Sequence, residues 1–188
     1  MKDRENLKSI LLTIFVFLFS MVFAAFCANA EGKAGWAGNL PAWRPNPDIW
    51  WVKILFWIPL LGREVNGFVL FNITFFLMAF LFIPLWGWAH KKVLGFREWG
   101  ELVCFFVIFS VVEDFLWFVI NPDYGLGKFS PSFILWHRHW LWIMPTDYWL
   151  GIAAWSIFGI WAKGWKWYLL VTGTVLLLTM ITVGIWTF

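Results

Sequence analysis

Long apolar runs constrain this chain more than any other feature of its sequence. Five such runs recur along the 188 residues, at 9–30, 67–89, 99–120, 148–162 and 167–187. Most come near the ~20 residues that a helix needs to cross the hydrocarbon core of a bilayer. Only 13% of the residues are charged, about half of the ~25% expected of a soluble domain. We therefore predict an all-α integral membrane protein formed by a single transmembrane domain, residues 1–188.

The first apolar run, 9–30, allows two interpretations. It follows Lys2, Arg4 and Lys8 and ends in Ala28-Asn29-Ala30, the small-x-small pattern of a cleavable signal peptide. The run is also longer than the ~7–15 residues of a usual signal core, which favours a retained signal-anchor. The sequence thus predicts five transmembrane helices, or four if the first segment is cleaved.

The basic residues give the predicted helices a direction. If the N-terminus is cytoplasmic, eight of the fourteen Lys and Arg residues fall in the short inner segments and six in the long outer segments, 31–66 and 121–147. This bias is the one that the positive-inside rule requires. We expect a cytoplasmic N-terminus and an extracytoplasmic C-terminus in a plasma or inner membrane. Because the basic residues flank apolar runs, the net charge of +3 indicates contact with lipid headgroups and no nucleic-acid partner.

Two further apolar segments, 49–61 and 133–144, are rich in Trp and too short to cross a membrane. Both fall on the predicted outer side. Their lengths suit interfacial or re-entrant helices. Many of the eighteen Trp residues lie near one of the two expected membrane surfaces, as in the aromatic belts of membrane proteins.

Glu113 and Asp114 are the most informative polar residues, because they lie inside the run 99–120. Carboxylates in a membrane span are costly and mark a functional site by default, unless a partner neutralises them. We consider the pair a candidate catalytic acid–base pair. The structural alternative is a polar cluster in which an arginine such as Arg138 neutralises the acids and Asn72 fills the remaining hydrogen bonds.

His137 and His139 form a His-x-His pattern in the second outer segment. Alternate residues of an extended chain share a face, so both imidazoles would then bind one metal ion, whereas on a helix they diverge. Asp123 and Asp147 are carboxylates of the same predicted side, and such a mixed ligand set suits Zn, Fe or Mn. The alternative is that these side chains bind lipid phosphates between the anchoring Trp rings.

Two aromatic residues complete the candidate site. Trp117 follows Glu113 by one helical turn and would shield the acids from water. Tyr124 belongs to the segment Asn121–Gly127, which is either a simple connector or a loop folded over the acids. Cys27 and Cys104 are expected at different depths, so a disulfide between them is not expected.

These residues support two hypotheses for the function. The first is a metal-dependent membrane enzyme that acts on a lipid or another apolar substrate at an outward-facing carboxylate and histidine site. The second is a non-catalytic membrane subunit or assembly factor that docks a protein partner through its Trp-rich outer segments.

Overall fold

The computed structural model describes residues 2–36, 39–46, 48–56, 66–76, 78, 93–137 and 139–187. The chain divides into two compact units, which are described separately. The first consists of Met1–Gly32 together with Val93–Phe188, and the second of Lys33–Lys92.

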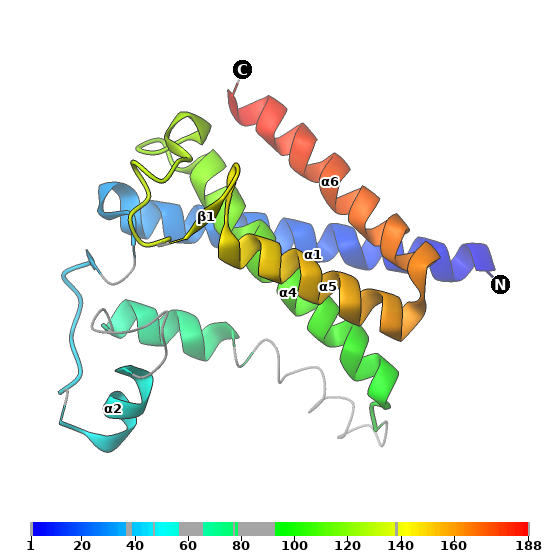
Figure 1. The fold of residues 1–188 in the computed structure, drawn as a ribbon, viewed down its shortest axis with the longest axis horizontal. Helices are drawn as coiled ribbons and strands as arrows, with labels where there is room; N and C mark the ends of the chain where they lie inside the picture. The colour runs from blue at the N-terminus through cyan, green and yellow to red at the C-terminus, as the bar shows by residue number, and fades with distance from the viewer. Residues whose placement is uncertain are drawn as a thin grey trace. The chain divides into compact units, whose positions relative to one another are not determined.

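Four long helices build the first unit: α1 (Lys2–Glu31), α4 (Phe96–Ile120), α5 (Thr146–Lys163) and α6 (Trp165–Thr187). Helix α4 contacts the other three and forms the centre of the unit (Figure 1). Its Cys104, Ile108 and Leu116 side chains are completely buried. The apolar run 99–120 therefore becomes the core of the helical packing.

Among the described residues, three helices are long and apolar enough to cross a membrane, over Arg4–Ala34, Phe96–Ile120 and Trp165–Trp186. The prediction of a mostly helical, membrane-associated chain is thus confirmed. The predicted five-helix count is not confirmed, since α5 is not among these three helices. Of the predicted span 67–89, the structure describes the short apolar helix Gly67–Phe76, and positions 79–89 lie outside the described residues. Orientation in the membrane and cleavage of the first segment stay predictions.

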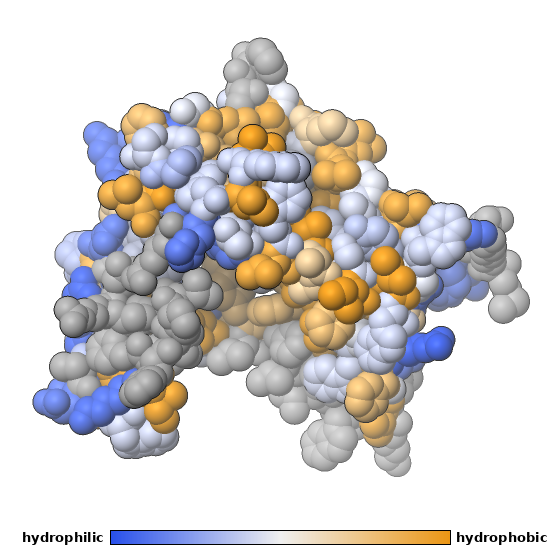
Figure 2. Space-filling model, viewed as in Figure 1, coloured by the Kyte–Doolittle hydropathy of each residue, from blue (hydrophilic) through white to orange (hydrophobic). Residues whose placement is uncertain are grey.

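Apolar side chains also cover much of the surface of the described residues (Figure 2). On α1, Phe15 and Val22 are about two-thirds exposed, and on α6 the same holds for Met180 and Ile185. Exposed apolar surface of this extent is rare on soluble monomers. It is what lipid-facing helices require, because lipid tails are themselves apolar.

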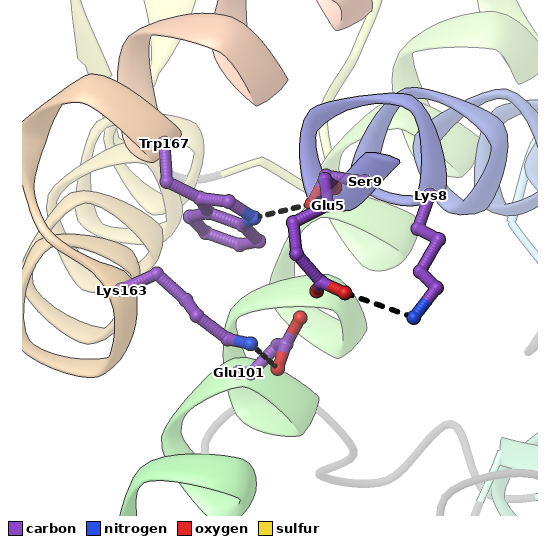
Figure 3. Close-up of polar contacts among 6 residues, drawn as sticks. All are labelled: Glu5, Lys8, Ser9, Glu101, Lys163 and Trp167. Atoms are coloured by element: carbon purple, nitrogen blue, oxygen red, sulfur yellow. Dashed lines mark hydrogen bonds and ion pairs between the residues drawn. The ribbon is translucent and has the colours of Figure 1, made fainter. Parts of the chain in front are cut away.

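One end of the first unit is joined by polar contacts (Figure 3). Lys163 at the end of α5 lies 2.8 Å from a carboxylate oxygen of Glu101 on α4. The indole N–H of Trp167 on α6 donates a hydrogen bond of 2.9 Å to the hydroxyl of Ser9 on α1. These contacts join α5 to α4 and α6 to α1 at the end of the unit where α1 and α4 begin.

The packing of α5 against α4 depends on glycine. A Cβ atom at Gly159 would lie 3.1 Å from the Cys104 sulfur and 3.2 Å from the Trp167 ring. At Gly151 it would lie 2.5 Å from a methyl carbon of Val111. Small residues let helices of membrane proteins approach closely, and these two glycines bring α5 against the middle of α4.

At the other end, Asn121 begins the connection from α4 to α5. Its side-chain amide donates to the Gly32 carbonyl, 3.2 Å away, and its side-chain oxygen accepts the backbone N–H of Asp123 at 2.9 Å. The end of α4 is thereby fastened to the end of α1. A 3-10 turn, η4 (Leu126–Lys128), follows.

A short antiparallel hairpin precedes α5. Its strands are β1 (Trp140–Leu141) and β2 (Met144–Pro145), with Trp140 opposite Pro145 and Leu141 opposite Met144. The prediction of a helix over 133–144 is therefore wrong. Aromatic residues favour extended conformations, and His137 is held by carboxylates of two helices, so tertiary contacts outweigh the local helical pattern.

The 3-10 turn η1 (Gly32–Ala34) leads from the first unit into the second, which contains α2 (Trp50–Phe56) and the helix Gly67–Phe76. Helix α2 falls within the predicted segment 49–61, whose residues 57–61 lie outside the described residues. Its place at a membrane surface stays a prediction. Asn66 caps the second helix, because its side-chain oxygen accepts the backbone N–H groups of Phe68 and Val69 at 3.0 Å.

Candidate functional site

His137 lies between two carboxylates from different helices. Its Nδ1 atom is 2.9 Å from Oδ2 of Asp147 at the start of α5, and its Nε2 atom is 3.2 Å from Oδ2 of Asp114 on α4. The contact with Asp114 is an ion pair without a hydrogen bond, because the geometry at Nε2 does not meet that of a hydrogen bond to any described residue. Only 10% of the His137 side chain is exposed. We call Asp114, His137 and Asp147 the His137 group.

The first turn of α5 supplies two members of this site in succession. Asp147 faces His137, and the next residue, Tyr148, donates its phenolic O–H to Oδ2 of Asp114 at 2.5 Å. Neighbouring residues of a helix point about 100° apart, which allows them to hold different partners. A carboxylate in a first helical turn is also favoured by the positive end of the helix dipole.

The carboxylates determine the charge of His137. Burial by itself lowers the pKa of His137, but the contacts with Asp114 and Asp147 outweigh burial and raise the pKa from the usual 6.5 to about 9. Burial would raise the pKa of Asp147, and the contact with His137 instead holds it below its usual value. At neutral pH, His137 is therefore an imidazolium with both ring nitrogens directed at carboxylates.

This pKa predicts how stability depends on pH. Because the pKa of His137 is higher in the folded than in the unfolded chain, its contribution is complete below about 6.5 and is lost as the pH rises through about 9. Over this pH range, we expect the free energy of unfolding to fall by ~1–3 kcal/mol. The effect is smaller than for a fully buried pair, because both carboxylates are partly exposed to solvent. Melting temperatures measured across this pH range, with His137→Gln as the reference, test it. A difference between the two proteins that stays constant or grows with pH would contradict the assignment.

Aromatic rings surround the His137 group. The imidazole lies 5.7 Å from the Tyr148 ring and 6.2 Å from the Phe118 ring, measured between centroids. Trp117 packs against Tyr124 at 5.0 Å and against Trp136 at 6.1 Å. The segment after α4 thus folds back onto the last turns of that helix, where it covers Trp117.

A second set of acidic groups adjoins the His137 group. Glu113 lies close enough to the Cys27 thiol and to the carboxylates of Glu31 and Asp114 for these groups to act on it electrostatically. Glu31, the last residue of α1, is only 9% exposed. Cys27 and Cys104 are both free and buried, which agrees with the expectation of no disulfide between them.

Of the four predicted metal ligands, the structure brings together His137 and Asp147, whose side chains lie 2.9 Å apart. His139 is exposed, and its backbone carbonyl accepts the N–H of Thr146. Asp123 contributes a backbone carbonyl to Lys128 and a backbone N–H to Asn121. Within the described part of the chain, no three or more His, Cys, Asp or Glu residues are arranged to hold a metal ion. The prediction of a Zn, Fe or Mn site therefore finds no support among those residues.

The structure does not test the predicted polar partners of Glu113 and Asp114. Arg138 lies outside the described residues, and Asn72 belongs to the second unit, so their part in neutralising the acids stays a prediction. His137 provides a positive charge beside Asp114 instead. Sequence reasoning missed Tyr148 and Glu31. Both stand at the predicted outer ends of apolar runs, so matching polar residues by their expected depth in the membrane would have found them.

No protein-family model matches this sequence, and comparison with curated proteins and with solved structures finds no significant match. The function must therefore be inferred from the residues of the site.

Proposed function

We propose that this protein is a membrane-embedded enzyme that uses the His137 group for acid–base chemistry on a lipid or another apolar substrate. The observation that carries the proposal is the position of His137, whose two ring nitrogens face carboxylates of α4 and α5. An ionisable group inside a membrane span is by default a sign of function, and Asp114 lies within the span Phe96–Ile120.

The three side chains differ in what they can contribute. Asp147 holds Nδ1 and so fixes the orientation of the imidazole. The side chains of Asp114 and Asp147 are 37% and 45% exposed, whereas that of His137 is 10% exposed. Only Asp114 lies within a helix able to cross the membrane, so an apolar substrate in the bilayer reaches Asp114 first. Asp114 is then the base that accepts a proton from the substrate. The His137 imidazole and the Tyr148 hydroxyl both contact Oδ2 of Asp114 and so fix the position of the carboxylate.

Lipid turnover by the purified protein tests this proposal. We expect vesicles of phosphatidylethanolamine and phosphatidylglycerol containing the native protein to accumulate a new lipid species, measured by mass spectrometry. Asp114→Asn, which keeps the shape of the side chain, should lower the rate roughly 10²–10⁴-fold, the usual contribution of a general base. His139→Ala, which changes an exposed histidine two residues from His137, should keep the native rate.

The outcome also distinguishes the alternative function. If the native protein and Asp114→Asn leave the same lipids unchanged, the enzymatic proposal fails for these lipids. A folded Asp114→Asn protein that still co-purifies with the partner of the native protein would then favour the non-catalytic subunit.

A further inference from the structure

The hairpin before α5 ends in apolar side chains that the described residues leave uncovered. Leu141, Trp142 and Ile143 are 52%, 86% and 77% exposed. We call these three residues the hairpin tip. A run of consecutive exposed apolar residues is unfavourable in water unless another apolar phase covers it.

The hairpin tip is held in place and is not a loose loop. The indole N–H of Trp149 on α5 donates a hydrogen bond of 3.0 Å to the Leu141 carbonyl. The Trp142 and Trp149 rings meet edge to face, with centroids 6.3 Å apart. Backbone pairing of β1 with β2 adds to these contacts. The exposed position of the tip is therefore built into the fold.

The backbone conformation at the tip is unfavourable for Trp142, the residue that occupies it. Trp142 has a φ of 57°, a left-handed conformation that glycine adopts at far lower cost than other residues. Two-residue hairpin turns with a positive φ at the first central position usually have glycine there. A bulky aromatic residue at this point indicates a role for the ring beyond the turn itself.

The hairpin tip continues an apolar face of α5. Trp149, which touches the tip, shares one face of α5 with Ile157 and Ile160, as the helical spacing requires. Ile157 is 67% and Ile160 is 44% exposed. On its other side, α5 packs against α4, one of the three helices able to cross a membrane. One exposed apolar surface thus extends from α5 to the tip, beside a membrane-spanning helix.

We propose that the hairpin tip inserts into the lipid of the same bilayer that α4 crosses, at the boundary between headgroups and acyl chains. Asp114, to which the neighbouring His137 is bound, lies six residues before the end of α4, or roughly 9 Å along the helix at 1.5 Å per residue. A hairpin anchored at that level lies near the membrane surface. Trp side chains concentrate at this depth, because their rings are apolar and their N–H groups are polar.

A depth measurement tests the insertion. A nitrobenzoxadiazole fluorophore is attached to Trp142→Cys, and the protein is placed in vesicles of phosphatidylcholine and phosphatidylglycerol. Gly127→Cys is the matched control, because it lies in the same connection, is exposed, and has open space where a Cβ atom would stand. The two native cysteines are buried and should remain unlabelled. Both variants must elute like the native protein on gel filtration.

We expect spin-labelled acyl chains to quench the fluorophore at position 142 several-fold more strongly than at position 127, and aqueous iodide to show the reverse preference. Equal iodide quenching at both positions would overturn the proposal. Protection of position 142 from both quenchers would overturn it too, because a protein surface would then cover the tip.

A second variant separates insertion from folding. Trp142→Gly suits the left-handed backbone, so its melting temperature in detergent should equal or exceed that of the native protein. A fluorophore on Ile143→Cys should nevertheless lose part of its quenching by lipid when Trp142→Gly is added. Unchanged quenching would show that Trp142 does not anchor the tip.

Discussion

Replacing His137 with alanine is expected to lower the free energy of unfolding by about 2–3 kcal/mol, which is less than the usual effect of removing one partner of a fully buried ion pair, because the Asp114 and Asp147 side chains are 37% and 45% exposed. The imidazolium is the positive charge placed directly between Asp114 and Asp147. Without it, two carboxylates face each other across the contact between α4 and α5. Thermal unfolding in detergent at neutral pH measures the effect.

His139→Ala is the control for this substitution. The same residue type is removed two positions away, where the side chain is exposed, so the change should stay within about 0.5 kcal/mol. If the two variants were equally stable, the ion pairs of His137 would not hold α4 and α5 together. Adding Asp114→Asn and Asp147→Asn to His137→Ala should restore part of the loss, since the uncompensated charges are then gone.

Gly159→Leu should destabilise the protein by about 3 kcal/mol, at the upper end of the usual cost of overpacking a core. A first side-chain carbon at this position already lies 3.1 Å from the Cys104 sulfur and 3.2 Å from the Trp167 ring. The remaining atoms of leucine have no room, so α5 must move away from α4 and from the start of α6. The melting temperature in detergent reports this loss.

Gly173→Leu is the matched control for the glycine prediction. Gly173 lies in α6, and a Cβ atom there would meet nothing within 4 Å. Leucine is also the better helix former, so this variant should be as stable as the native protein or slightly more stable. A larger loss at Gly173 than at Gly159 would contradict the packing described for α4 and α5.

Hydropathy predicted the long helices but not their ends. The run 99–120 lies within α4, which begins three residues earlier, at Phe96, and includes the charged residues Arg97 and Glu98 in its first turn. Hydropathy does not report such turns, because it measures transfer to lipid and not backbone hydrogen bonding. The prediction of a helix over 133–144 failed for a different reason. Contacts of His137 with residues distant in the sequence decide the conformation of this segment.

The sequence identified most members of the site but not their roles. Asp114, His137 and Asp147 were all expected to matter, the first as a catalytic acid and the other two as metal ligands. The spacing of histidines in a sequence does not reveal which atoms their ring nitrogens face. In the structure these nitrogens face two carboxylates, which produces an imidazolium ion pair. Tyr148 escaped notice because a tyrosine beside an apolar run also fits an ordinary aromatic belt.

The protonation state of His137 tests the central claim most directly. Nitrogen-15 NMR of histidine-labelled protein in detergent, assigned with His137→Gln, follows both ring nitrogens of this residue through a pH titration. We expect a doubly protonated ring at neutral pH and a pKa near 9, with a clear decrease in Asp114→Asn. A neutral His137 at pH 7, or a pKa at or below its usual 6.5, would contradict the ion-pair group and the acid–base function inferred from it.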